Sequence, residues 1–346
     1  MNKCSPHFEH PVHVSIPPSA VVEVPNGRLY TDTLSNVSVI TEDNKLLGEA
    51  SLQLGEGQPE DSHIFRQQFF STPKKYKGTV FQILIGGSGD DNYFHWLFDA
   101  LPRIHFLQKS GWFDQVDWFV VPRYKHHFQK ATLRLLGIGE DKIIEGHQET
   151  HIQADRLLAS TYARYGDHIP VWVCDFLRKS FSDTAMPDAA SPSHIYISRS
   201  DSGSRVVANE AELLEVLDNH GFTKITLSDL SFQEQVKVFA AAKVIVAPHG
   251  AGLANLVFCE KGTKVVELFA DGYVLPLYYD LANKVGLDYS YLVCQTEAKA
   301  SDVKQAMKLN ISVNIEKFKS KLDRLFEVGA LKYLVVTEMT DMLSFI

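Results

Sequence analysis

The sequence predicts an α/β fold whose C-terminal half contains a parallel, doubly wound sheet. The chain has 346 residues, which is enough for two domains. Hydrophobic residues make up 45% and charged residues 22%, as in ordinary globular proteins. In the C-terminal half, short apolar segments alternate with helical patterns, and this alternation is typical of parallel strands joined by crossover helices.

The N-terminal half shows the same alternation more weakly, after short strands and turns over residues 12–56. We expect strands at 79–85, 117–121 and 156–159, a Gly-rich turn at 86–89, and helices from residue 92 and at 128–136. Asp90 or Asp91 should cap the helix that starts at Asn92, and Pro102 should end or kink it.

A linker rich in Ser, Pro and Ala is predicted at residues 182–193. Beyond it we expect strands at 195–198, 223–227, 244–247 and 264–268, and helices at 209–221, 232–242 and 253–258. Asn209 with Glu212 resembles a capping box, and Gly221 should end that helix. The predicted domains are 1–185, with a β-rich N-terminal extension, and 190–300, followed by a helical tail at 301–346 that packs back across them.

Composition argues against several classes of protein. The formal net charge of −8 argues against binding nucleic acid through its phosphates. The four cysteines are too few for a disulfide scaffold and too widely spaced for a metal motif, which indicates a reducing compartment. No stretch approaches 18 apolar residues and the N-terminus lacks an apolar segment, so we expect neither an integral membrane segment nor a signal peptide.

Polar side chains lie at the ends of three predicted strands of the C-terminal half, namely Arg199, His249 and Glu267. Because the carboxyl ends of parallel strands meet at one edge, we expect the three side chains together. The helix that follows opens with the segment His249-Gly250-Ala251-Gly252-Leu253. Glycines let a ligand approach the backbone, and a helix start offers free N–H groups to a phosphate.

Arg199 and Arg205 could bind the same phosphates through paired hydrogen bonds, and Glu267 could accept hydrogen bonds from ribose hydroxyls. A tight turn with a structural histidine would explain the Gly-rich segment alone equally well. The two arginines favour the ligand site.

In the N-terminal half, His95 and Asp99 share one face of an otherwise apolar helix. A buried polar pair needs a partner or a function, so a structural His–Asp hydrogen bond and a catalytic pair both remain open. The sequence contains no Gly-x-Ser-x-Gly nucleophile motif, no phosphate-binding Walker motif, no His-Glu-x-x-His and no Asp-x-Asp metal anchor.

These motifs, taken in order, resemble glycosyltransferase family 61. The matching residues are Ile195-Tyr-Ile-Ser-Arg199, Arg205, Asn209-Glu210, Gln235, Ala242, His249 to Leu253, Asn255 and Val266-Glu267-Leu268, with His95 and Asp99 upstream. The resemblance implies a GT-B fold, in which two Rossmann-like domains face a cleft. It also implies inverting transfer of a hexose or pentose from a nucleotide-sugar, with the donor in the C-terminal domain and the acceptor facing it from the N-terminal one.

An inverting transfer needs a base and positive groups that stabilise the leaving diphosphate. We assign the base to Asp99, with His95 either orienting it or acting as the base itself; burial could raise the pKa of Asp99 and improve it. Asn92 and Arg103 belong to the acceptor side. The expected donor-binding residues are Arg199, Arg205, His249, Gly250, Ala251, Gly252, Leu253, Asn255 and Glu267.

We expect no metal and no cofactor apart from the nucleotide-sugar, which should be UDP-linked. The expected partner is a glycan or lipid-linked glycan acceptor, in synthesis of a capsule, lipopolysaccharide or other surface polysaccharide. Without an anchor or signal sequence, a bacterial, soluble, cytoplasmic enzyme fits best, with peripheral association at the inner face of the membrane. Two alternatives remain: a GT-B nucleotide-sugar epimerase, and a catalytically silent nucleotide-sugar-binding module.

Overall fold

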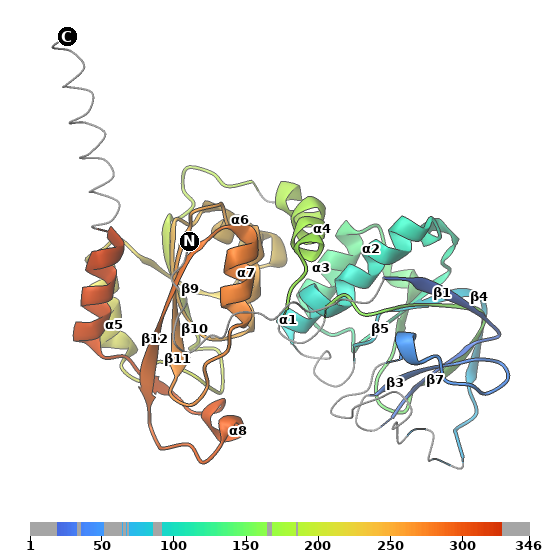
Figure 1. The fold of residues 1–346 in the computed structure, drawn as a ribbon. Coiled ribbons are helices and arrows are strands. Elements are labelled where there is room, and N and C mark those ends of the chain that lie inside the picture. The colour runs from blue at the N-terminus through green and yellow to red at the C-terminus, as the bar shows by residue number, and fades with distance from the viewer. Residues whose placement is uncertain are drawn as a thin grey trace, which may run out of the picture.

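Two α/β halves lie side by side in the structure, a computed structural model that describes residues 19–32, 36–51, 64, 67, 69–85, 92–164, 168–184 and 186–326 (Figure 1). The predicted α/β class is confirmed by the two sheets and their helices. The GT-B assignment and the domain boundaries stay predictions. The predicted turn at 86–89 and the caps Asp90 and Asp91 lie outside the described residues.

The first half is built on a seven-stranded sheet. Its strands are β1 (Val21–Pro25), β2 (Arg28–Thr31), β3 (Val37–Ile40), β4 (Lys74–Gln82), β5 (Trp118–Val121), β6 (Ile143–Glu145) and β7 (His151–Ser160). Strands β4 to β7 pair in parallel, whereas β1, β2 and β3 pair antiparallel. Its helices are α1 (Tyr93–His95), α2 (Leu101–Ser110), α3 (His127–Leu135) and α4 (Val171–Phe181).

The second half has a six-stranded sheet. Its strands are β8 (His194–Ser198), β9 (Thr223–Thr226), β10 (Val244–Pro248), β11 (Lys264–Ala270), β12 (Asp288–Thr296) and β13 (Ile311–Ser312). All pairs are parallel except β12 with β13, and β10 is buried along its whole length because helices cover both faces. The helices are α5 (Glu210–Asp218), α6 (Phe232–Ala241), α7 (Leu277–Val285), α8 (Val303–Ala306) and the 3₁₀-helix η9 (Ala251–Phe258).

The described part of the predicted C-terminal tail joins this second half. It contributes β13 and a helix over 315–326, and Phe318 and Leu322 enter the second core.

The strand order reverses once in each sheet. In the first, the chain runs outward from β4 through β5 to β6 and then returns to the other side of β4 as β7. In the second, it runs from β8 to β9 and returns to the other side of β8 as β10. At such a point the segments leaving two neighbouring strands turn in opposite directions, and a crevice opens at their carboxyl ends.

Pro102 does not end the helix that starts after residue 92, so the first of the two predicted outcomes, an end or a kink, is wrong. The chain passes from α1 through a π-helical turn (Trp96–Ala100) into α2, which continues to Ser110. In the π turn the amide of Leu101 donates to the carbonyl of Trp96. Pro102 therefore falls in the first turn of α2, where its missing N–H is not needed.

The predicted capping box of Asn209 and Glu212 is also wrong. The Asn209 amide pairs with the backbone of Val313, accepting from its N–H and donating to its carbonyl, both at 2.9 Å. A capping box forms at α6, where Ser231 and Glu234 exchange hydrogen bonds. The backbone of Val313, the residue after β13, thus takes the hydrogen bonds that a local cap would have used.

Apolar packing joins the two halves. Helices α1, α3 and α4 contact η9, α6 and α7. One apolar cluster runs through both halves. Phe181 of α4 packs edge-on against Phe232 of α6 at 5.1 Å between ring centroids. Arg178 of α4 donates to the carbonyls of Val257 and Cys259, both at 2.6 Å. Helix α4 falls within the range 1–185 that we predicted as the N-terminal domain, and it packs closely on the C-terminal half.

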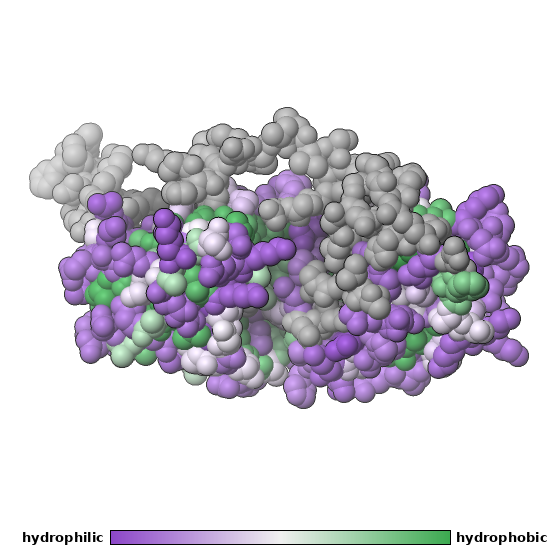
Figure 2. Space-filling view, turned by 90° about the horizontal axis from the view of Figure 1, so that it is seen from below, coloured by the Kyte–Doolittle hydropathy of each residue, from purple (hydrophilic) through white to green (hydrophobic). Residues whose placement is uncertain are grey.

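Hydrophilic side chains dominate the face shown in Figure 2, over both halves. None of the helices in the described ranges is long and apolar enough to cross a membrane.

Replacement of Arg178 tests how tightly α4 holds the second half. Arg178→Met should lower the free energy of unfolding by about 2–4 kcal/mol, because two carbonyls lose a charged donor. Denaturant unfolding measures the change. Lys179→Met is the control, since Lys179 is exposed and its replacement should cost less than about 0.5 kcal/mol. Equal stability of the two variants would contradict the prediction.

Candidate active site

A pocket of about 240 Å³ lies at the strand-order reversal of the second sheet. Segments following β8 and β10 form most of it, and two aromatic side chains of the first half close it. The lining residues are Tyr93, Phe128, Ile197, Ser198, Arg199, Asp201, Leu227, Ser228, Gln235, Ala247, Pro248, Gly250, Gly252 and Leu253. No group of three or more His, Cys, Asp or Glu side chains in the described ranges could hold a metal ion.

Arg199 supplies the positive charge of this pocket. Its Nε donates to the carbonyl of Ser204 at 3.1 Å and its Nη2 to Oγ of Ser202 at 2.6 Å. Within the described part of the chain, Nη1 donates to no partner and Arg199 forms no ion pair. Burial, and secondly the like charge of Arg205, lower the pKa of Arg199 to about 10, so it stays protonated at neutral pH. An anion at this place would relieve the repulsion.

The glycines of the segment allow close approach, as expected, but the groups that approach belong to the protein. A Cβ on Gly250 would lie 2.0 Å from Nη1 of Arg199, and one on Gly252 would lie 2.4 Å from Cδ1 of Leu227. The absence of a side chain at Gly250 therefore places the Arg199 guanidinium against the start of η9. The first amides of a helix have no intrahelical acceptor. The guanidinium of Arg199 therefore lies beside the free N–H groups at the start of η9.

His249 is buried and held by Glu267. Its Nδ1 lies 2.5 Å from Oε1 of Glu267, whose other oxygen accepts from the hydroxyl of Tyr289. The imidazole also stacks on Phe269, at 5.1 Å between ring centroids. Glu267 is fully buried and lies behind His249. This burial argues against the predicted contact between Glu267 and a ribose, which stays a prediction.

Asn255 joins the two halves. Its Oδ1 accepts from the hydroxyl of Tyr93 at 2.7 Å, and its Nδ2 donates to Gln235 Oε1 at 3.0 Å and to the Gly252 carbonyl at 3.2 Å. The side chain is fully buried. In this structure Asn255 fixes the pocket wall through protein partners, and its expected contact with a donor stays a prediction.

Arg205 supports the Gly-rich segment from the other side. Its Nε donates to the carbonyl of His249 at 2.9 Å, and its Nη1 donates to the carbonyl of Met307. The guanidinium lies 5.6 Å from the centre of the Tyr273 ring. The backbone at Arg205 has φ of 55°, a left-handed conformation that is uncommon for a residue with a side chain. A direct phosphate contact by Arg205 stays a prediction.

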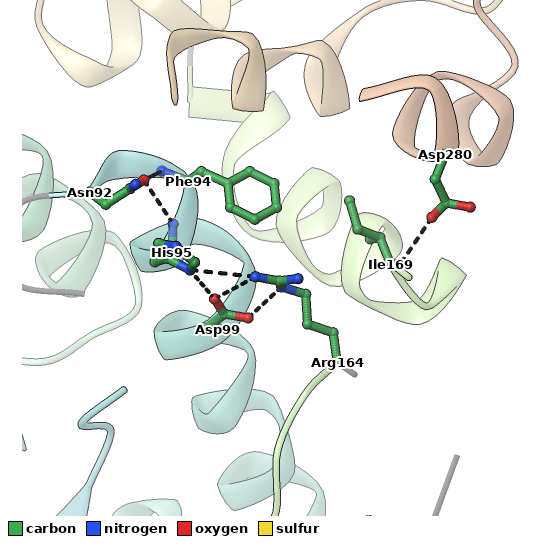
Figure 3. Close-up of polar contacts among 7 residues, drawn as sticks. All are labelled: Asn92, Phe94, His95, Asp99, Arg164, Ile169 and Asp280. Atoms are coloured by element: carbon green, nitrogen blue, oxygen red, sulfur yellow. Dashed lines mark hydrogen bonds and ion pairs between the residues drawn. The ribbon is translucent and has the colours of Figure 1, made fainter. Parts of the chain in front are cut away.

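A second cluster lies at the reversal point of the first sheet. His95 and Asp99 follow β4, and Arg164 follows β7. The three side chains point toward one another (Figure 3). Nδ1 of His95 lies 2.6 Å from Oδ2 of Asp99. Arg164 forms an ion pair with the same carboxylate: its Nη2 lies 3.0 Å from Oδ2 and its Nε 2.5 Å from Oδ1. The His95 and Asp99 side chains keep 27% and 20% of their surface exposed, so a ligand can reach them.

The pKa of Asp99 is lowered, contrary to the expected rise. Burial acts to raise it, but the hydrogen bond from His95 and the ion pair with Arg164 outweigh burial. Asp99 is therefore a stable carboxylate with both oxygens engaged. Nε2 of His95 makes no hydrogen bond within the described ranges, so the imidazole offers a free nitrogen.

The two residues expected on the acceptor side contact the protein itself in this structure, and a contact with an acceptor stays a prediction. Asn92 is the N-cap of α1, and its Oδ1 accepts from the amides of Phe94 at 2.9 Å and His95 at 3.4 Å (Figure 3). Arg103 is 1% exposed, so it does not reach an acceptor in this structure. Its guanidinium lies 5.1 Å from the centre of the Tyr162 ring, on the inner side of the Asp99 cluster.

The two clusters connect through aromatic rings. Tyr93 lines the pocket two residues before His95, and Phe94 between them packs against Tyr278 at 5.9 Å. The Tyr278 ring in turn lies 5.4 Å from that of His249.

No sequence pattern predicted Arg164, Tyr93, Phe128 or Asp201 as site residues. Arg164 stands 65 positions from Asp99, and no local pattern marks it. Its one signal is its place just after an apolar strand, β7, at a reversal of strand order.

Removal of Arg164 should reverse the pKa shift of Asp99. In Arg164→Met the effect of burial gains weight, so the carboxyl should titrate at a higher pH than in the wild type, measured by carbon-13 NMR. In the wild type, the depressed pKa stabilises the fold above the ordinary value near 3.9, and this is lost as the pH falls through the folded-state pKa. If the titration of Asp99 were unchanged in Arg164→Met, Arg164 would not be the cause of the lowered pKa of Asp99.

A family model described as glycosyltransferase 61 matches residues 93–266, which is half of the chain. Among the curated relatives is protein O-linked-mannose beta-1,4-N-acetylglucosaminyltransferase 2 of Xenopus laevis, 31% identical over 135 residues, covering 37% of this chain and 23% of that protein. Its Bos taurus and Homo sapiens counterparts are 35% identical over 99 and 96 residues, covering 27% and 26% of this chain and 17% and 16% of theirs. The matches thus span less than a quarter of these relatives. The chain belongs to the glycosyltransferase 61 family.

Proposed function

We propose that this protein transfers a sugar, with inversion, from a nucleotide-sugar to a hydroxyl of a glycan acceptor. Arg199 carries the proposal: a half-buried cation with a free Nη1, set against the start of η9 at a reversal of strand order. The leaving group of such a transfer is a nucleoside diphosphate, whose charge this arrangement would stabilise. We propose a GT-B arrangement, with the donor in the second half and the acceptor facing it from the first.

His95 is the proposed base, and Asp99 orients it. Asp99 is a poor proton acceptor because the hydrogen bond with His95 and the ion pair with Arg164 lower its pKa. The contact at Nδ1 fixes the imidazole and leaves Nε2 for the acceptor hydroxyl. Arg164 keeps the carboxylate ionised.

We propose a uridine-linked donor and no essential metal. For the acceptor we propose a glycan of a bacterial surface polysaccharide, such as capsule or lipopolysaccharide, elongated in the cytoplasm at the inner face of the membrane. The named relatives carry O-linked mannose in their name, so mannosides belong in the same test.

The overall test is release of nucleoside diphosphate from a panel of nucleotide-sugars, with and without oligosaccharide acceptors. Acceptor-dependent release supports the transferase. Conversion of the donor without acceptor would indicate an epimerase, and binding without any conversion would indicate a silent module.

Gly250→Ala tests the anion site. The new Cβ would meet Nη1 of Arg199 at 2.0 Å and displace it. We expect nucleoside-diphosphate affinity to fall about tenfold or more, since a charged hydrogen bond contributes about 1.5–3 kcal/mol. Calorimetry measures it. Gly203→Ala is the matched control, because nothing lies within 4 Å of its Cβ position. Equal affinities for the two variants would refute the site.

The pH profile tests the base. Wild-type turnover should fall on acidification in the range where histidine side chains titrate. His95→Gln should lower turnover by about two orders of magnitude or more and keep nucleotide affinity. His105→Gln, on the far part of the same helical run, is the control. A wild-type profile that stays flat into the carboxyl range would instead make Asp99 the base.

A further inference from the structure

We propose that Asp201 accepts hydrogen bonds from a vicinal diol of the nucleotide-sugar and so selects ligands that carry one. Asp201 follows β8, two residues after Arg199, and lines the pocket. This inference rests on the proposed donor site and names a contact within it that neither the motifs nor the comparisons assign.

The polar groups of the inner pocket are already bonded to the protein. Ser198 donates to Glu210 at 2.6 Å, Gln235 donates to the Leu227 carbonyl at 3.0 Å, and Tyr93 donates to Asn255. They therefore have little capacity left to recognise a ligand. The remaining lining side chains are mainly apolar, so recognition depends on the few free polar groups.

The free polar groups of the lining are the hydroxyl of Ser228 and two side chains of opposite charge. Nη1 of Arg199 is a donor for an anion. Asp201 is an acceptor: it is exposed at the pocket and its carboxylate makes no hydrogen bond to any residue in the described ranges. It is also the one carboxylate among the lining residues, since Glu267 is fully buried and occupied by His249 and Tyr289.

A carboxylate beside an anion site repels the phosphates unless another part of the ligand donates to it. A nucleotide-sugar offers such donors as pairs of neighbouring hydroxyls, and two carboxylate oxygens can accept from two of them. The diol can belong to the ribose or to the transferred sugar. The ribose diol and the sugar diol offer the same hydrogen-bond donors. Ligands that lack the ribose diol or the sugar distinguish the two.

The sign of the effect separates this role from simple electrostatics. Burial and the charge of Arg205 lower the pKa of Arg199, and the charge of Asp201 partly offsets the shift. Loss of Asp201 alone would make the pocket more positive and would strengthen diphosphate binding. Weaker binding on its removal therefore requires a lost contact with the ligand.

The experiment measures the affinities of wild type, Asp201→Ala and Asp229→Ala by calorimetry. Asp229 ends the 3₁₀ turn Leu227–Asp229, is exposed and does not line the pocket, so its replacement reports the charge effect alone. UDP, GDP, ADP and CDP are screened first. The tightest is then compared with its 2′,3′-dideoxy analogue and with its glucose and N-acetylglucosamine conjugates.

If the ribose is the partner, Asp201→Ala should weaken the diphosphate about tenfold or more. The dideoxy analogue, which lacks the diol, should bind the variant as tightly as the wild type or more tightly, because the charge that repels its phosphates is gone. If the sugar is the partner, only the conjugates should weaken. Asp229→Ala should weaken none of them. The proposal is overturned if Asp201→Ala binds every ligand as tightly as the wild type or more tightly. If no nucleoside diphosphate binds the wild type, the donor site itself is wrong, and that result is distinct from a failure of Asp201.

Discussion

The reversal of strand order in each sheet is the constraint on which the site depends. Parallel strands place their carboxyl ends at one edge, but only at a reversal do the two following segments turn apart and leave room between them. In the second sheet this separates the segments after β8 and β10, and Arg199 and Gly250 face each other there. In the first it separates the segments after β4 and β7, which carry His95 with Asp99 and Arg164. In both halves, the cluster of polar side chains therefore lies at the reversal of strand order.

A short stretch of helix sets the position of one cluster relative to the other. Asn92 caps α1, Tyr93 bonds Asn255 across the two halves, and His95 pairs with Asp99. The π turn that follows accommodates Pro102 and keeps the chain helical, so the Asp99 cluster is carried on one continuous element. Because Asn255 also bonds Gln235, the same contact fixes the wall of the pocket. A change at Tyr93 would therefore disturb both clusters together.

The sequence predicted those parts of the site that lie in consecutive residues. Periodicity located β8 to β11, and spacing paired His95 with Asp99, because both depend on local geometry. No local sequence pattern could identify Arg164, because its partner Asp99 is distant in the chain. Nor could such a pattern distinguish a polar side chain that faces a ligand from one consumed by the protein, as Asn255 is. Asn209 failed for a related reason: its local capping pattern was outcompeted by Val313, about a hundred residues away.

The two halves contain the same chemical pair in different surroundings. Each has a histidine whose Nδ1 contacts a carboxylate, at 2.6 Å for His95 and 2.5 Å for His249. The His95 side chain keeps 27% of its surface exposed and its carboxylate is held by a cation, whereas the His249 side chain keeps 6% and its carboxylate is sealed by Tyr289. Proton exchange with a substrate requires access, which only the first pair has. The second pair instead fixes the shape of the Gly-rich segment, since the backbone carbonyl of His249 is where Arg205 attaches. Exposure, more than the identity of the residues, thus separates the pair that we propose to react from the pair that fixes the Gly-rich segment.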